Sequence, residues 1–419
     1  MTEIGLTPDQ IELRKRAREF AHDVLARVED TIAAHATPRA RFEATRPAYE
    51  AAIRAGFMRR VIPMPFGGEG TGLVDMAVVA EEFHSVDVNV SLTMFGSLLG
   101  LMPIFLGGSE KQHRRWLVPF LAAEGTPLAA LANSEPGGSA NFDAPKPAEG
   151  CRTTARREGE EWVIHGRKQW VSSATGWDGR GPDILTIVCR TDPAKPTAEA
   201  LSVLAAEGPM QGLTTERDLR GLGHRGHLTP RFRLEGVRVP QENVVGALGA
   251  GRELVNGAFT GTAALVGVMS AGVLRAAFDF ALGFAKSERR GGPKPIIDHQ
   301  AVGYLLADVK GALEAVRALS LRACAAADAN HPGAAELALH AKVFGSETAV
   351  RCLTDLHRVV GIDAYDVDAT PLGRHLLDAL AFPLFDGGNM GVRRRQLHAL
   401  LSDPAYDPLH TLPQASPAL

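Results

Sequence analysis

The chain has 419 residues and a formal net charge of −3 at pH 7, with 45% hydrophobic and 22% charged residues. This composition is typical of a globular protein with an ample core, and the length suggests two or three domains. The near-neutral charge balance argues against a nucleic-acid-binding protein. The four cysteines are far apart in the sequence, so the chain predicts neither a disulfide scaffold nor a metal site; they are Cys151, Cys189, Cys324 and Cys352.

The first part of the chain, from residue 7 to about 124, is predicted to be helical. Thr7 and Gln10 have the spacing of a helix-capping box. Phe42–Gly56 and Met76–His84 show the apolar periodicity of amphipathic helices. Ser91–Leu106 is almost entirely apolar, which favours a helix that is buried on every side or that packs on a flat ligand. The N-terminus lacks the pattern of a signal peptide, so we expect a cytoplasmic protein.

The pattern changes to short strands at about residue 126. β-branched residues, stretches of period two and turn residues indicate a small β domain. Its expected strands cover residues 127–132, 153–157, 162–171, 184–190 and 230–239, and a polar, glycine-rich loop covers 133–141. A turn at 239–246 closes this domain.

From about residue 251 the periodicity is helical again. Long helices are expected over residues 251–288, 298–327, 333–361 and 391–401. The uncharged run Phe259–Leu274 contains Thr, Ser and Gly and is followed at once by Arg275, so we interpret it as a buried bundle helix and not as a membrane span. The chain is therefore predicted to be an α+β protein that is mainly α. Its expected domains are an N-terminal helical domain (1–125), a middle β domain (126–246) and a C-terminal helical bundle (247–419).

One carboxylate near the C-terminus stands in an unusual context. Asp386 follows an apolar run and precedes Gly387 and Gly388. Apolar surroundings make a carboxylate a better base, and the glycines would let a planar ligand approach the backbone closely. A helix starting at Asp386 would put Arg393 on the same face two turns later, where its guanidinium would restrain the carboxylate. Alternatively, Asp386 is simply a helix N-cap. These residues alone favour that simpler interpretation, because Asp is a preferred cap.

The order of the elements and several of their loops resemble the acyl-CoA dehydrogenase superfamily of FAD-dependent flavoenzymes. Leu131–Asn141 resembles the family's T-E-P-x-A-G-S-D loop, and Trp162–Ser173 resembles its Y-V-L-N-G-x-K-x-W-I-T-N segment. Val237–Gly246 is similar to V-x-V-P-x-E-N-L-L-G. The resemblance covers nearly the whole chain. It implies a middle domain built as a β-barrel or sheet, a C-terminal four-helix bundle and FAD as cofactor.

The resemblance also implies which residues bind the flavin. Trp170 would cover one face of the ring, serines and backbone amides would serve its polar edge, and Ser139 would reach the pyrophosphate. The cofactor set is Leu131, Asn133, Ser134, Ser139, Trp170, Ser172, Ser173, Arg290, Gln300, Gly387 and Gly388. In this family, residues at the Arg290 position contact the FAD of a neighbouring subunit, and Gln300 would lie on the adenosine side. The family arrangement implies a homotetramer.

Some segments are similar to the nitroalkane oxidases, a branch of the superfamily that uses an Asp as its base. The similar segments are 41–47, 263–267, 285–292, 383–389 and 393–396. Acyl-CoA dehydrogenases usually carry Y-E-G-T where this chain has Phe385–Gly388. The resemblance implies Asp386 as the base, Arg393 as its charged partner, and Thr262 where nitroalkane oxidases have a Ser near the flavin. We expect the hydrogen bond of that hydroxyl to be retained.

The implied reaction is the oxidation of a neutral nitroalkane. Asp386 takes the α-proton, the carbanion adds to flavin N5, and the products are an aldehyde or ketone, nitrite and hydrogen peroxide, with oxygen as the electron acceptor. One alternative is an acyl-CoA dehydrogenase or oxidase that uses Asp386. Another is a flavin-dependent N-monooxygenase, which needs no carboxylate base. A non-enzymatic scaffold is disfavoured by the intact Ser139, Trp170 and Arg290 positions.

Overall fold

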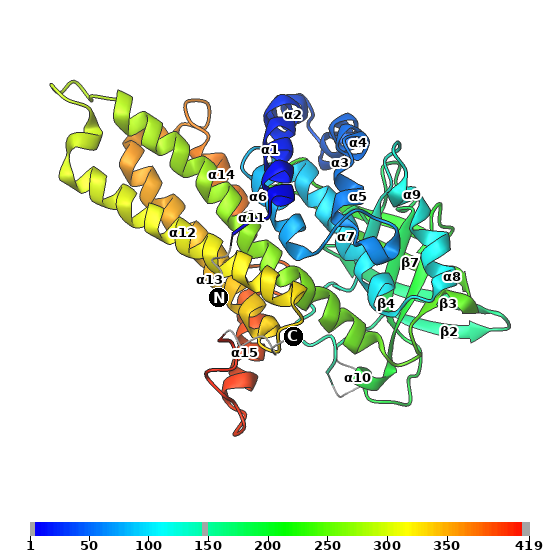
Figure 1. The fold of residues 1–419 in the computed structure, drawn as a ribbon. Coiled ribbons are helices and arrows are strands. Elements are labelled where there is room, and N and C mark those ends of the chain that lie inside the picture. Colours follow the sequence, from blue (N-terminus) through cyan, green and yellow to red (C-terminus); the bar gives the residue numbers. More distant parts are fainter. Residues whose placement is uncertain (1–4, 145–149, 413–419) are drawn as a thin grey trace. The chain divides into compact units, whose positions relative to one another are not determined.

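The computed structural model describes residues 5–144 and 150–412, and the chain divides into two compact units (Figure 1). The first unit comprises Met1–His22, Gly72–Val88 and Thr260–Leu419, and the second comprises Asp23–Thr71 and Asn89–Phe259. The predicted α+β, mainly α fold is confirmed, whereas the three domain boundaries stay predictions.

The first unit is helical. Its elements are α1 (Pro8–Asp23), α6 (Leu73–His84), the larger part of α11 (Gly251–Ser287), η4 (Ile296–Asp298), α12 (Gln300–Asp328), α13 (Ala334–Val360), η5 (Gly361–Tyr365), α14 (Leu372–Ala379), η6 (Asn389–Arg393) and α15 (Arg394–Leu401). The capping box expected at Thr7 and Gln10 is confirmed, because each residue's backbone N–H donates to the other's side chain. Helix α14 and the single π-helical turn η6 were not predicted.

Small residues bring the long helices of this unit into contact. A Cβ atom on Gly267 of α11 would lie 2.8 Å from the carbonyl oxygen of Ala341 in α13, and one on Gly345 would lie 3.0 Å from the Cα of Gly267. No side chain fits between the two backbones at this point. Helices α11, α12 and α13 accordingly run side by side (Figure 1).

A buried carboxylate joins α1 and α6 to this bundle. Glu82 in α6 accepts two hydrogen bonds from the guanidinium of Arg18 in α1 and two from that of Arg275 in α11, all between 2.8 and 3.0 Å. Paired, bidentate contacts of this kind are the strongest that a carboxylate makes with arginine. The N-terminal helices α1 and α6 therefore belong structurally with the C-terminal helices.

The second unit combines short helices with a sheet. Its helical elements are η1 (Leu25–Arg27), α2 (Val28–Ala33), α3 (Pro38–Ala44), α4 (Arg46–Arg54), α5 (Phe57–Val61), η2 (Met64–Phe66), α7 (Val88–Gly107), α8 (Glu110–Trp116), α9 (Val118–Leu121), α10 (Thr197–Ala200), η3 (Gln241–Asn243) and the start of α11. The single helix expected over Phe42–Gly56 is wrong, since the chain divides it at Thr45 into α3 and α4. Pro47 lies in the first turn of α4, where a missing backbone N–H costs nothing.

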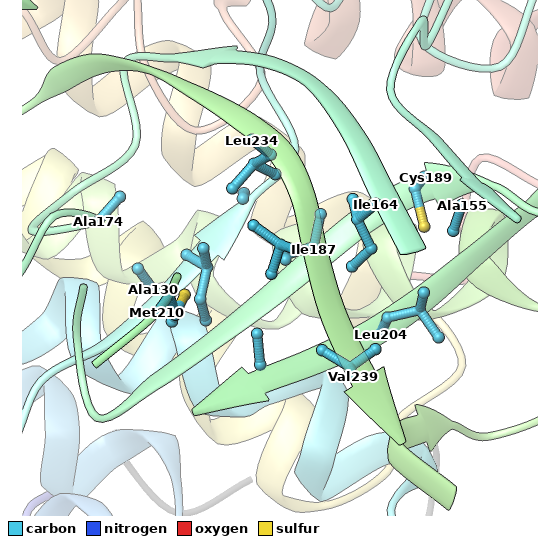
Figure 2. Close-up of a cluster of buried hydrophobic side chains, with 14 of the residues drawn as sticks. Ala130, Ala155, Ile164, Ala174, Ile187, Cys189, Leu204, Met210, Leu234 and Val239 are labelled. Carbon is cyan, nitrogen blue, oxygen red and sulfur yellow. The ribbon is translucent and has the colours of Figure 1, made fainter. Parts of the chain in front are cut away.

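The sheet has the strand order β6-β7-β3-β2-β4-β5-β8, and β1 pairs in parallel with β4. The strands are β1 (Ala129–Ala132), β2 (Thr154–Glu158), β3 (Glu161–Gln169), β4 (Ile184–Arg190), β5 (Leu201–Glu207), β6 (Leu213–Asp218), β7 (Pro230–Pro240) and β8 (Val244–Val245). The five predicted strands are present, whereas β5, β6 and β8 were missed. Buried side chains from these strands form one core, shown in Figure 2 around Ile187, Leu204 and Leu234.

Helix α7 packs directly on the sheet. A Cβ atom on its Gly100 would lie 2.3 Å from the backbone nitrogen of Ala130 in β1, and the Thr186 hydroxyl in β4 donates to the Gly100 carbonyl at 3.0 Å. Helices α7 and α11 are both long and apolar enough to cross a membrane, but 67% and 72% of their most apolar windows are buried inside the protein. Burial of this extent is what a core helix shows.

A buried ion pair fixes the loop that follows β1. Lys168 in β3 donates to the Glu135 carboxylate at 2.9 Å and to the carbonyls of Asn133 and Val188 at 3.1 and 2.8 Å. Burial disfavours the charged form of Glu135, but the Lys168 ammonium and hydrogen bonds from Thr153 and Arg152 outweigh burial and lower the pKa of the carboxyl to about 2. The loop that carries Asn133 and Ser134 is thereby attached to the core.

The substitution Lys168→Met is expected to lower the free energy of unfolding by about 3–5 kcal/mol, because it leaves the buried Glu135 carboxylate without its counter-charge. The matched control is Lys111→Met, which breaks an exposed ion pair with Glu242 and should cost no more than about 1 kcal/mol. Denaturant unfolding of both variants measures the difference. Equal losses of stability would show that the buried pair contributes no more than a surface one.

Candidate active site

Asp386 lies in a strained turn between α14 and η6. Its φ is +52°, and Gly387 follows with a φ of +71°. A non-glycine residue at positive φ is uncommon, and such strain collects at functional sites. The helix expected to start at Asp386 is absent there, because η6 begins at Asn389 with Gly388 before it. The simpler interpretation of Asp386 as a helix N-cap is therefore wrong.

Arg393 holds both the backbone and the side chain of Asp386. Its guanidinium donates to the Asp386 carbonyl oxygen through Nε at 3.0 Å and through an Nη atom at 2.6 Å, and it contacts carboxylate Oδ2 at 3.1 Å. The two side chains are only 1% and 5% exposed. The expected pairing of these residues is confirmed. The predicted role of each in a reaction stays a prediction.

Thr262 provides the second contact to the carboxylate. Its hydroxyl in α11 donates to Asp386 Oδ1 at 3.0 Å. Each carboxylate oxygen thus has a donor from a different element, and each can accept at least one more hydrogen bond. The sequence predicted a Thr262 hydroxyl that keeps its hydrogen bond, and the structure gives Asp386 as its partner.

The surroundings of Asp386 are more charged than the sequence indicated. We expected an apolar pocket, but the turn lies close to Lys342 of α13 as well as to Arg393. Burial lowers the pKa of Lys342 to about 8, with the nearby Asp386 charge acting in the opposite direction. Lys342 lies more than 40 positions before Asp386 in the sequence, and no local motif connects the two residues.

Gly387 and Gly388 have a clear role within the turn. A Cβ atom on Gly387 would lie 3.1 Å from the guanidinium carbon of Arg393, and one on Gly388 would lie 2.9 Å from the Leu384 carbonyl oxygen. Glycine at position 387 therefore leaves room for the Arg393 guanidinium, and glycine at position 388 lets the backbone pass close to the Leu384 carbonyl. Their predicted contact with a cofactor stays a prediction.

The second unit carries the other group of predicted cofactor residues. Leu131 is in β1, and the loop after it contains Asn133, Ser134 and Ser139. The hydroxyls of Ser134 and Ser139 lie 3.3 Å apart. The side-chain oxygen of Asn133 is buried and has no hydrogen-bond partner among the described residues. A buried polar atom left in this state fits a ligand that supplies the missing hydrogen bond.

The turn after β3 shows the same features. Trp170 and Ser173 have φ values of +61° and +55°. Trp170 is 53% exposed, and the fully buried Ser173 hydroxyl also lacks a partner within the described part of the chain. An exposed indole held in a strained conformation beside a partnerless buried hydroxyl suits a flat ligand with a polar edge.

His227 supports Ser172 and was missed by the sequence analysis. Its ring nitrogens lie 3.0 Å from the Ser172 hydroxyl and 3.3 Å from that of Thr93, which itself donates to the Asn89 carbonyl at 2.9 Å. Burial, followed by the charge of His224, lowers the pKa of His227 to about 3, so the ring is neutral. Since the Thr93 proton goes to Asn89, Nδ1 of His227 is the donor and Nε2 accepts from Ser172. The Ser172 oxygen then remains an acceptor for a ligand.

Arg290 and Gln300 lie elsewhere in the first unit. Arg290 donates to the Val360 carbonyl at 2.5 Å and pairs with Asp363 at 2.8 Å. Gln300 is the first residue of α12 and is exposed. Their predicted contacts with the cofactor stay predictions.

Three family models cover most of the chain. They are the N-terminal, middle and C-terminal domains of acyl-CoA dehydrogenase, and they match residues 7–124, 130–237 and 249–401. The predicted superfamily is thereby confirmed. Nitroalkane oxidase and acyl-CoA dehydrogenase relatives are FAD flavoproteins, which confirms the predicted cofactor. The partnerless oxygens of Asn133 and Ser173 and the exposed Trp170 fit this group.

Among individual proteins, the chain is 42% identical to nitroalkane oxidase from Podospora anserina over 96% of both chains. It is 38% identical to nitroalkane oxidase from Fusarium oxysporum over 97% of both. A probable acyl-CoA dehydrogenase from Mycobacterium bovis is 30% identical over 94% of this chain and 97% of its own.

The structural comparison gives the same result. A nitroalkane oxidase with an active-site Asp-to-Asn substitution, crystallized with 1-nitrooctane, matches with a TM-score of 0.93 and 36% identity over 97% of this chain and 99% of its own. A second nitroalkane oxidase structure, solved to examine the roles of an Arg and an Asp in that flavoprotein, also matches with a TM-score of 0.93 and 36% identity over 97% of this chain and 99% of its own. The chain therefore belongs to the acyl-CoA dehydrogenase family of flavoenzymes, and it shares more of its sequence with the two nitroalkane oxidases than with the probable acyl-CoA dehydrogenase from Mycobacterium bovis.

Proposed function

We propose that this protein is an FAD-dependent nitroalkane oxidase. The observation that carries the proposal is the buried Asp386, whose two carboxylate oxygens are held by Thr262 and Arg393. A carboxylate with fixed orientation and remaining acceptor capacity suits a general base. The acyl-CoA dehydrogenase alternative is favoured less, because its relative shares only 30% of its residues with this chain.

The substrate would be a neutral nitroalkane, in which the nitro group makes the neighbouring C–H acidic. Asp386 accepts this proton, and the electron pair of the broken bond moves onto the carbon and the nitro oxygens. Arg393 and Thr262 hold the carboxylate so that its remaining lone pairs keep one direction while the proton moves. FAD, when bound, accepts two electrons. The overall balance consumes nitroalkane, water and oxygen and yields aldehyde or ketone, nitrous acid and hydrogen peroxide.

The residues of the second unit would orient the cofactor. Trp170 offers an exposed aromatic face, Ser172 offers an acceptor oxygen, and Asn133 and Ser173 offer the buried polar atoms described above. Ser139 would serve the pyrophosphate. These assignments are supported by the geometry of the loops and by the family resemblance.

Oxygen as the electron acceptor is supported by the names of the relatives, which are oxidases. Anaerobic mixing with nitroethane should bleach the flavin, and admission of air should restore its absorbance with release of hydrogen peroxide. Nitrite should form in equal amount. A short acyl-CoA that bleaches the flavin where nitroethane does not would instead establish the acyl-CoA alternative.

We also propose that the protein is a homotetramer. Three large hydrophobic side chains on or next to η5, those of Ile362, Tyr365 and Val367, are 79%, 87% and 76% exposed. Exposed apolar groups that gather in this way mark association surfaces. Light scattering on the purified holoprotein measures the mass. The expected cytoplasmic location stays a prediction.

Asp386→Asn is expected to retain FAD and to oxidise neutral nitroethane at least about a hundredfold more slowly, the loss typical of a missing general base. The preformed nitronate has already lost this proton, so it should reduce the flavin of the variant at close to the wild-type rate. Stopped-flow reduction with both forms of the substrate tests this. Turnover of neutral nitroethane near the wild-type rate would remove Asp386 from the mechanism.

Arg393→Met is expected to slow the oxidation of neutral nitroethane about a hundredfold, because small displacements of reacting groups have effects of this size. It removes the contacts to both the carbonyl and the carboxylate of Asp386. Arg358→Met is the matched control, since Arg358 is 68% exposed and pairs with Asp355 on the surface of α13. Equal kcat/KM values for the two variants would contradict the role of Arg393.

A further inference from the structure

Lys342 is a fully buried cation next to the active-site turn. It lies in α13, and its side chain is 0% exposed. Its Nζ atom donates to the Phe382 carbonyl oxygen and to Asn389 Oδ1, both at 2.8 Å. These two acceptors lie on either side of Asp386 in the sequence. One ammonium group therefore connects the start and the end of the turn that carries the carboxylate.

Asn389 extends this connection along α13. Its side-chain amide donates to the Ser346 hydroxyl at 3.0 Å and to the Glu347 carboxylate at 3.1 Å. Its backbone N–H donates to the Pro383 carbonyl at 2.8 Å, which closes the turn. Successive side chains of one rigid helix thus hold the turn at both ends, whereas Arg393 holds it at Asp386 itself.

A lysine at this buried position lowers the stability of the fold unless its ammonium group is compensated. An isolated ammonium costs several kcal/mol to bury, and an apolar side chain of similar length would fill the same space. The charges that act on it are those of Asp386, Arg393 and Glu347. A neutral amine keeps two N–H donors, so Lys342 can donate to the Phe382 carbonyl and to Asn389 Oδ1 whether it is charged or neutral. The connection therefore depends on the presence of the side chain and not on its charge alone.

We propose that Lys342 is a positioning residue for the base Asp386 and selectively supports the proton-abstraction step. It acts through the turn, because its side chain is fully buried and donates to the Phe382 carbonyl and the Asn389 side chain. The inference rests on the proposed nitroalkane oxidation. Without Lys342, the Phe382 carbonyl and the Asn389 side chain lose their common donor, and Asp386 is left to its contacts with Arg393 and Thr262. Fewer contacts would then hold the backbone of Asp386 at its strained, positive φ.

A loss of activity with the neutral substrate alone distinguishes a residue that positions Asp386 from one that only stabilises the fold. Neutral nitroethane needs a correctly aimed carboxylate, whereas ethyl nitronate is already deprotonated. A displaced Asp386 should therefore slow oxidation of the neutral form alone, and a change of about 1 Å is enough for about a hundredfold loss. A purely structural lysine would affect both forms of the substrate, since both need the same bound flavin.

The experiment compares Lys342→Met with Lys310→Met, which makes the same substitution at a half-exposed lysine of α12. We expect Lys342→Met to keep its flavin spectrum, to lose about a hundredfold in kcat/KM for nitroethane and to change less than about threefold with the nitronate. Lys310→Met should match the wild type with both. Equal losses of Lys342→Met with both substrates, or no loss with nitroethane, would overturn the proposal.

Asn389→Ala provides a second test if Lys342→Met does not fold. It removes one acceptor of the lysine and both amide contacts to α13 while Lys342 stays in place, so the same selective loss with nitroethane is expected. Equal effects on both substrates would again overturn the proposal. A wild-type protein that oxidises the nitronate and not nitroethane, or neither, would contradict the proposed function and with it the role of Lys342, whereas an unselective loss in Lys342→Met would overturn that role alone.

Discussion

The contact between Arg393 and Asp386 is the constraint on which the active-site turn depends. The guanidinium binds the carbonyl and the carboxylate of the same residue. It therefore fixes the backbone conformation and the direction of the side chain together. A lysine has no planar fork and would not hold two acceptors at a fixed separation in this way. The absence of a side chain on Gly387 is part of the same arrangement, because a Cβ atom there would press on the guanidinium.

Asp386 combines burial with charge, and this bears on what it does. A carboxylate that only stabilised the fold would be expected to direct all its acceptor capacity to fixed donors. Here Thr262 donates to one oxygen and Arg393 donates to the other. The orientation is set, yet lone pairs remain for a proton. This combination favours a base over a purely structural acid, and it agrees with the Asp of the related oxidases.

The sequence predicted the order of the helical and β segments and the pairing of Asp386 with Arg393, because both depend on patterns between residues that are close in the sequence. Helical periodicity, the box at Thr7 and Gln10, and the spacing of Asp386 and Arg393 are all short-range signals. The pair is formed for a different reason than expected, since a π-helical turn replaces two α-helical ones. The division between α3 and α4 at Thr45 could also have been predicted, because Pro47 is typical of the first turn of a new helix. Strands β5 and β6 were missed because neither shows a clean period of two.

The contacts that could not be predicted are those between distant parts of the chain. Lys342 with Asn389, His227 with Ser172, and Lys168 with Glu135 each join segments that are more than 30 positions apart. Nothing in a run of local residues identifies such a partner. The strained φ values of Asp386 and Trp170 could not be predicted either. They result from tertiary contacts that outweigh the local preference of non-glycine residues for negative φ.

Lys168 and Lys342 show a common way to support a functional loop. Each is fully buried, donates to the carbonyl of a residue in or next to a loop, and contacts a side chain of that loop. An ammonium has three donors spread around one atom on a flexible stem, so it can reach acceptors that face different directions. It makes these contacts from the buried side of the loop. A buried lysine is thus suited to fix a loop whose exposed groups must remain available to a ligand, which is why both lysines lie beside loops that carry predicted site residues.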